Sequence, residues 1–88
     1  MAAFSVISLS PNPELDKAIT TAYAGAYLAL SATAWLVADT GVTTKDVCDK
    51  INVRHGGITR VIVTKIESYF GVAPPNIWEW LKIKIVEP

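Results

Sequence analysis

Few side chains in this sequence belong to the types that catalyse reactions, and their spacing predicts no catalytic centre. The one histidine, His55, follows Arg54 and precedes two glycines, a basic loop that could cradle a phosphate but lacks the spacing of a nucleotide-binding motif. The one cysteine, Cys48, falls on the apolar side of a predicted helix, where a buried thiol is the common role. A Ser-His-Asp or Cys-His centre is not assignable, since one loop histidine would have to serve every scheme.

Three acids near the middle of the chain raise the question of a metal ion. Asp39 closes a predicted strand, Asp46 suits the first turn of a helix, and Asp49 falls on the polar side of that helix. Their number and spacing match no ligand pattern for a hard cation such as Mg²⁺. We therefore expect solvated and helix-capping carboxylates, with no metal ligand and no cofactor.

Length and composition indicate one domain. The 88 residues are 51% apolar, which is enough for a single hydrophobic core spanning 1–88. Eight basic side chains balance eight acidic ones, so no long-range field draws the chain to nucleic acid or to anionic lipid. A single cysteine excludes an internal disulfide, and the N-terminal residues lack the basic start and long apolar run of a signal peptide. We therefore expect a cytoplasmic location.

Residues 18–38 form a run of 21 positions without a charged side chain, about the length of a membrane span. The signal for membrane insertion is weak, because alanine, serine and threonine occupy most of the positions where a span has large apolar residues. The run divides at Gly25, which is placed to follow the end of a helix in the left-handed conformation. We therefore expect a helix face followed by two buried strands, and no membrane span.

The expected elements follow from helix caps, β-branched runs and turn residues. Asn12 with Pro13 predicts one helix start, and Thr43 with Asp46 predicts another. Thr59–Ile66 is the strongest β-branched stretch, and we expect it to be a central strand. The remaining expected elements are strands at Ala3–Leu9, Tyr27–Ser31 and Thr33–Asp39, a helical turn at Ile77–Leu81 and an edge strand at Lys82–Val86.

This order of elements predicts an α+β fold. It is the order of a ferredoxin-like split βαβ (βαββαβ) two-layer sandwich, here with a C-terminal helical turn and edge strand. Both main helices are expected on one face of an antiparallel sheet. The opposite face would then meet solvent or a partner.

The C-terminal extension, residues 70–88, is the part most informative about function. Trp78 and Trp80 lie two positions apart, so on a helical turn they point in different directions, and a small domain can hardly bury both. One is expected in the core and the other at a dimer interface, where aromatic side chains supply much of the binding energy. The candidate interface residues are Tyr69, Phe70, Trp78, Trp80, Ile83 and Ile85. The candidate nucleic-acid contacts are Arg54, His55, Arg60, Lys65, Lys82 and Lys84.

Three stretches of the chain resemble a known group of proteins. Ser31–Thr40, Thr44–Ile51 and Val61–Ile66 are similar to small ferredoxin-like proteins related to the CRISPR adaptation endonuclease subunit, in particular the SinR-like branch, and the match covers most of residues 3–66. The resemblance implies a homodimer built by packing sheets together, with C-terminal strands exchanged or added across the interface. In active members it also implies a metal-dependent phosphodiesterase with an aspartate at the end of the first strand. Serines stand there in this chain, and a neutral hydroxyl is a poor ligand for Mg²⁺.

We therefore expect a non-catalytic homodimeric binding protein rather than an enzyme. It would act through its open sheet face and aromatic C-terminal segment, on a partner that is either protein or nucleic acid. The alternative is a Mg²⁺-dependent nuclease of the CRISPR-adaptation or toxin-like type, for which Mg²⁺ would be the cofactor.

Overall fold

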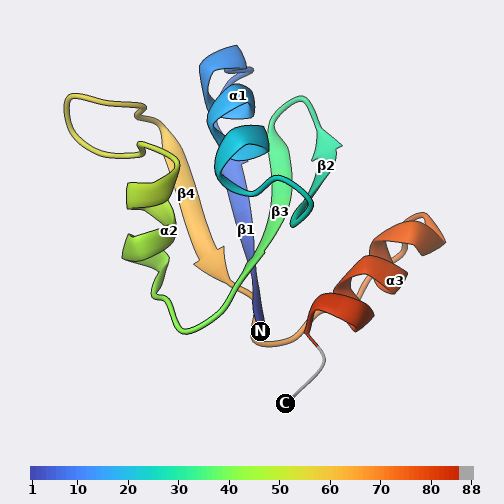
Figure 1. Ribbon diagram of the computed structural model, residues 1–88. Coiled ribbons are helices and arrows are strands. Elements are labelled where there is room, and N and C mark those ends of the chain that lie inside the picture. The colour runs from blue at the N-terminus through green and yellow to red at the C-terminus, as the bar shows by residue number, and fades with distance from the viewer. Residues whose placement is uncertain (86–88) are drawn as a thin grey trace.

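The structure is a computed structural model that describes residues 1–85, and it contains four strands and three helices within them (Figure 1). The first six elements appear in the predicted order of strand, helix, strand, strand, helix and strand. The elements are β1 (Ala2–Ser8), α1 (Pro13–Ala22), β2 (Tyr27–Ser31), β3 (Ala34–Asp39), α2 (Thr44–Lys50), β4 (Val61–Lys65) and α3 (Pro75–Lys84).

The four strands form one antiparallel sheet in the order β2-β3-β1-β4, which confirms the ferredoxin-like α+β prediction. The expectation that Thr59–Ile66 forms a central strand is wrong, because β4 lies at an edge and β1 and β3 occupy the centre. The connection from β3 through α2 passes over β1 and places β4 on its far side. β-branched residues indicate that a segment suits a sheet, and they do not indicate its place in the order of strands.

One face of the sheet packs against α1 and α2 and forms the main core. Trp35 is its largest fully buried side chain, and its indole Nε1–H donates a hydrogen bond of 3.1 Å to Asp16 Oδ1 on α1. This bond fixes the helix to the sheet and satisfies the polar atom of a buried tryptophan. The other buried members of this core are Phe4, Val6, Leu15, Ile19, Tyr23, Val37, Val47, Ile51 and Ile58.

Local capping interactions set the helix starts, as predicted. Asn12 Oδ1 accepts a hydrogen bond of 3.1 Å from the Leu15 N–H, and Pro13 is the first residue of α1. Thr43 and Asp46 form a complete capping box at the start of α2. Gly25 has a φ of +78°, the left-handed conformation that the turn after α1 requires.

The uncharged run 18–38 is divided among several short elements, and the expectation of two buried strands is corrected, because β3 is buried while β2 lies at the sheet edge and is largely exposed. The run covers part of α1, the turn at Gly25, all of β2 and most of β3. Among residues 1–85, no helix has both the length and the apolar character needed to cross a membrane.

The prediction of a helical turn followed by an edge strand at Lys82–Val86 is wrong, because α3 continues as a helix to Lys84; Val86 lies outside the described residues. The edge strand was predicted from a short alternation of lysine and isoleucine. A longer pattern decides the outcome: Ile77, Leu81 and Ile85 recur every four residues, and all three belong to one hydrophobic cluster.

This cluster lies on the face of the sheet opposite α1 and α2. Leu81 of α3 is buried against Ala3 of β1 and Leu36 of β3, whose immediate neighbours Phe4 and Trp35 face the main core. Because side chains alternate along a strand, Ala3 and Leu36 must face the other way. The expectation that no helix covers this second face is therefore corrected: α3 covers one end of it.

Candidate interaction surface

The end of the second sheet face that α3 does not cover carries an apolar row across three strands. Ile7 of β1 is the register partner of Ala34 on β3 and of Ile62 on β4. Ile7 is 38% exposed and Ile62 is 53% exposed. We call Ala34, Ile7 and Ile62 the uncovered row.

A pair of hydroxyl groups separates the uncovered row from α3. Ser5 and Thr64 are register partners on β1 and β4, and their side chains share a hydrogen bond. Leu36, the register partner of Ser5 on β3, and Ala3, further along β1, are buried under Leu81. The second face is thus buried under α3 at one end, polar on β1 and β4 in the middle, and apolar but exposed at the other end.

A second exposed apolar surface lies just before α3, in the segment Tyr69–Val72. The Tyr69 ring stacks on Trp78 of α3, with 5.8 Å between centroids and 9° between planes. Tyr69, Phe70, Gly71 and Trp78 line a shallow hollow of about 150 Å³. Phe70 and Val72 are fully exposed. The segment is therefore held on α3 through Tyr69, while its two outward apolar side chains lie in water.

The predicted interface residues occupy three kinds of environment. Tyr69, Phe70 and Ile83 are exposed, with Ile83 at 68%. Trp78, Trp80 and Ile85 are half-buried, and each packs against the cluster that contains Leu81. Both tryptophans therefore pack partly buried against the Leu81 cluster, and Trp78 in addition stacks on Tyr69. This differs from the expected division into one core residue and one contact residue.

Four members of the two exposed surfaces are absent from the predicted interface residues, namely Val72, Ala34, Ile7 and Ile62. Strand alternation contains a signal for two of them, because Ile7 follows Val6 and Ile62 precedes Val63, and both valines face the main core. The sequence holds no comparable signal for Val72, whose exposure depends on where the loop runs after β4.

The predicted nucleic-acid contacts do not gather into one surface. Arg60 and Lys65 flank and end β4, whose five residues span roughly 17 Å. Arg54 and His55 lie in the exposed loop that leads to the Arg60 end, where the Arg54 N–H donates a hydrogen bond of 3.1 Å to the Ile58 carbonyl. Arg54, His55 and Arg60 therefore form a first group at one end of β4. This group is distant from a second group, which consists of Lys65 and the α3 lysines.

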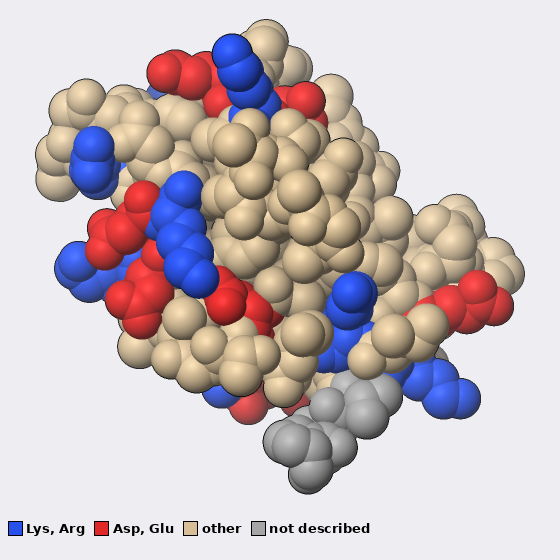
Figure 2. Space-filling model, in the orientation of Figure 1, with Lys and Arg blue, Asp and Glu red and all other residues tan. Residues whose placement is uncertain are grey.

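The second group is itself divided between the two faces of the sheet. Lys65 is the register partner of Phe4, so its side chain leaves the sheet on the α1 and α2 side, and its ammonium lies 3.9 Å from Glu67. Lys82 and Lys84 belong to α3 on the other side. On the face that Figure 2 shows, basic and acidic side chains are interspersed and no continuous basic surface forms.

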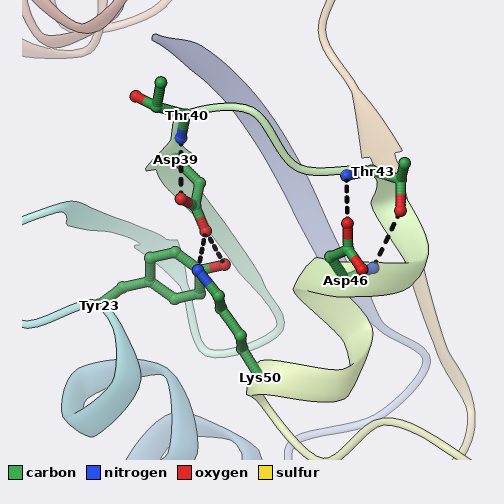
Figure 3. Close-up of polar contacts among 6 residues, drawn as sticks. All are labelled: Tyr23, Asp39, Thr40, Thr43, Asp46 and Lys50. Atoms are coloured by element: carbon green, nitrogen blue, oxygen red, sulfur yellow. Dashed lines mark hydrogen bonds and ion pairs between the residues drawn. The ribbon is translucent and has the colours of Figure 1, made fainter.

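The three acids proposed and rejected as metal ligands each have a separate partner. Asp39 accepts hydrogen bonds from Tyr23 and Lys50, Asp46 completes the capping box of α2, and Asp49 pairs with Lys45 at 3.1 Å (Figure 3 shows the first two). Within residues 1–85, no group of three histidine, cysteine, aspartate or glutamate side chains is close enough to hold a metal ion.

Figure 3 shows that Asp39, at the end of β3, meets two side chains from other parts of the chain: Tyr23, just after α1, and Lys50, at the end of α2. Asp39 Oδ2 accepts from Tyr23 Oη at 2.8 Å and from Lys50 Nζ at 2.6 Å, and its Oδ1 accepts from the Thr40 N–H at 2.8 Å. Burial raises the pKa of Asp39, but the hydrogen bonds from Lys50, Thr40 and Tyr23 outweigh it and the net pKa lies below 3.8. Burial and the bond to Asp39 raise the pKa of Tyr23 above its ordinary range.

The end of β1, where the nuclease alternative requires carboxylates, offers a single acid that is already engaged. The hollow there is lined in part by Asn12, Asp16 and Trp35, and Asp16 is the one acidic residue among its lining residues. Asp16 accepts the hydrogen bond of the Trp35 indole. At Cys48, burial and the neighbouring Asp49 raise the thiol pKa, which disfavours the nucleophilic thiolate.

A comparison of the chain with models of known protein families and with curated proteins finds no match. The chemistry of the exposed surface is therefore the basis for a functional assignment.

Proposed function

We propose that this protein is a non-catalytic homodimeric binding protein that acts through its uncovered row and its Tyr69–Val72 segment. The observation that carries the proposal is the full exposure of Phe70 and Val72 on a segment that Tyr69 holds in place on Trp78. Burying a side chain of this size contributes about 1.5–3 kcal/mol. Grouped apolar side chains that remain in water are characteristic of interaction sites.

The chemistry of the surface favours a protein partner over nucleic acid. Neither the uncovered row nor Tyr69–Val72 contains a charged residue. Nucleic-acid affinity depends mainly on cations placed against phosphates, and the candidate cations of this chain are divided between two ends and two faces. A second copy of the chain is the simplest partner, because it supplies the same apolar groups in equal number.

The resemblance to the SinR-like branch supports the same assignment. We propose that the chain is a non-nucleolytic relative of that group. At the end of β1, where the resemblance implies an aspartate, the chain has Ser8, whose hydroxyl donates to the Ser10 carbonyl. A homodimer is the assembly that the resemblance implies.

Sedimentation velocity over a concentration series tests the proposal. Wild type is expected to be a dimer, and the double variant Phe70→Ser, Val72→Ser is expected to dissociate at least about 100-fold more readily, because four apolar side chains leave the two-fold interface. The fold should be unchanged, since neither residue contributes to the core.

Asp49→Ser is the control. The Asp49 side chain is 50% exposed and belongs to α2, which packs on the opposite face of the sheet from the uncovered row. A wild type that stays monomeric at every concentration, or a double variant that dimerises as well as the Asp49 control, would refute the proposal.

A further inference from the structure

Two separate apolar surfaces are exposed on the same chain, and neither covers the other. The uncovered row lies on the second face of the sheet, and Phe70 and Val72 lie on the segment before α3. Within one chain the two surfaces do not cover one another, since Ile7, Ile62, Phe70 and Val72 are all accessible. Any contact that covers both must therefore come from outside the chain.

We infer that Phe70 and Val72 of each copy pack on the uncovered row of the other copy. This inference rests on the proposed homodimer and adds which residues meet. Each copy supplies one row and one segment, so a two-fold axis brings two identical contacts together and leaves neither surface exposed. Packing row against row would leave Phe70 and Val72 in water, and packing segment against segment would leave Ile7 and Ile62 in water.

The chemistry of the two surfaces is matched. Both lack charged residues, so neither side loses the hydration of an ion on contact. The row begins with the small Ala34 on β3 and continues with the larger Ile7 on β1 and Ile62 on β4, while Phe70 and Val72 project freely from a segment anchored by the Tyr69–Trp78 stack. A preformed segment loses little conformational entropy when it binds.

The area available suits a small interface. A buried aromatic side chain contributes about 150–250 Å², and a standard stable interface buries about 800 Å² on each partner. Phe70, Val72 and the accessible parts of Tyr69, Ile7 and Ile62 on each copy come closest to that area only if both contacts form together. A single one-sided contact is too small for a stable complex.

Cysteine cross-linking between differently labelled copies tests which residues meet. All variants carry Cys48→Ser, so that each chain has one cysteine. Chains with Phe70→Cys are mixed with chains with Ile62→Cys and oxidised. The mixture is expected to give about tenfold more disulfide-linked heterodimer than a mixture of Phe70→Cys with Asp49→Cys, because a disulfide requires the two β-carbons within about 4.5 Å.

Asp49 is a close control because its side-chain exposure of 50% is near the 53% of Ile62, while α2 places it on the opposite face of the sheet. Val72→Cys in place of Phe70→Cys keeps the test open if the loss of the Phe70 ring weakens the dimer. Equal cross-linking to positions 62 and 49, with dimers still present by sedimentation, would overturn this inference and leave the proposed function standing. A monomeric wild type would overturn both and assign the surface to a different protein.

Discussion

Asp39 shows how a single carboxylate that resembles a catalytic or metal-binding residue serves the fold. It ends β3, and its partners come from the turn after α1 and from the end of α2, so its hydrogen bonds hold both helices to the sheet. Lys50 also lies 5.8 Å from the centre of the Tyr23 ring. Both oxygens of the carboxylate thus have hydrogen-bond partners within the chain.

We predict that Asp39→Asn lowers the free energy of unfolding by about 1–2 kcal/mol at pH 7, because a neutral amide replaces the acceptor of two charge-assisted or buried hydrogen bonds. The pKa of Asp39 is lower in the folded chain than 3.8, so its ionised form stabilises the fold above about pH 4. That contribution is lost as the pH falls through the folded pKa. Urea unfolding at pH 7 and at pH 3 measures both effects.

Asp49→Asn is the control for this prediction. Asp49 pairs with Lys45 on the exposed side of α2, where such a pair contributes about 0.5 kcal/mol or less. If Asp39→Asn and Asp49→Asn are equally mild, or if the deficit of Asp39→Asn is as large at pH 3 as at pH 7, the structural role given to Asp39 is wrong.

At the scale of elements, the sequence correctly predicts where the first two helices begin. It does not predict the position of β4 in the sheet or the course of α3. Asn12 and Thr43 were identified because their hydrogen bonds lie within four residues. The edge position of β4 depends on how α2 crosses the sheet, and the course of α3 depends on Leu81 reaching Ala3 and Leu36. Contacts between residues this distant in the chain leave no fixed spacing in the sequence.

The candidate surface likewise combines residues that the sequence predicts with residues that it does not predict. The exposure of Tyr69 and Phe70 was anticipated from their residue types, and their role in an interface stays a prediction. Ile7 and Ile62 belong to the surface only because α3 stops short of them. If α3 lay a short distance further along the sheet, it would bury both isoleucines. Nothing in the sequence of β1 or β4 specifies the position of α3.

We predict that Leu81→Ala releases α3 from the second face. Leu81 is the one fully buried residue of the helix, and its truncation should lower the free energy of unfolding by about 2–4 kcal/mol. Because Trp78 and Trp80 pack against the same cluster, the fluorescence emission of the released helix should shift to the red.

Ile83→Ala on the same helix provides the comparison, since Ile83 is exposed and should change neither stability nor emission. Trp35 stays in the main core in both variants and supplies a constant background. Unchanged emission in Leu81→Ala would mean that α3 is not held by this contact.

At the scale of the whole molecule, dimer formation should appear as stability that depends on concentration. A partner that binds only the folded chain raises the midpoint of thermal unfolding as the protein concentration rises. We predict that the midpoint of wild type, measured by calorimetry, falls as the protein is diluted. The midpoint of the Phe70→Ser, Val72→Ser variant should stay constant, and a constant midpoint for wild type would speak against the dimer.

The central place of β1 has a consequence for the synthesis of the chain. Its partners are made much later, because Ala2 pairs with Asp39 and Phe4 pairs with Lys65. At a translation rate of about 5–20 residues per second, the first strand waits roughly 3–12 s before both of its partners have been made. Both of its edges are free until β3 is made and one edge is free until β4 is made, so the nascent chain is more exposed to aggregation and to chaperones than the finished fold.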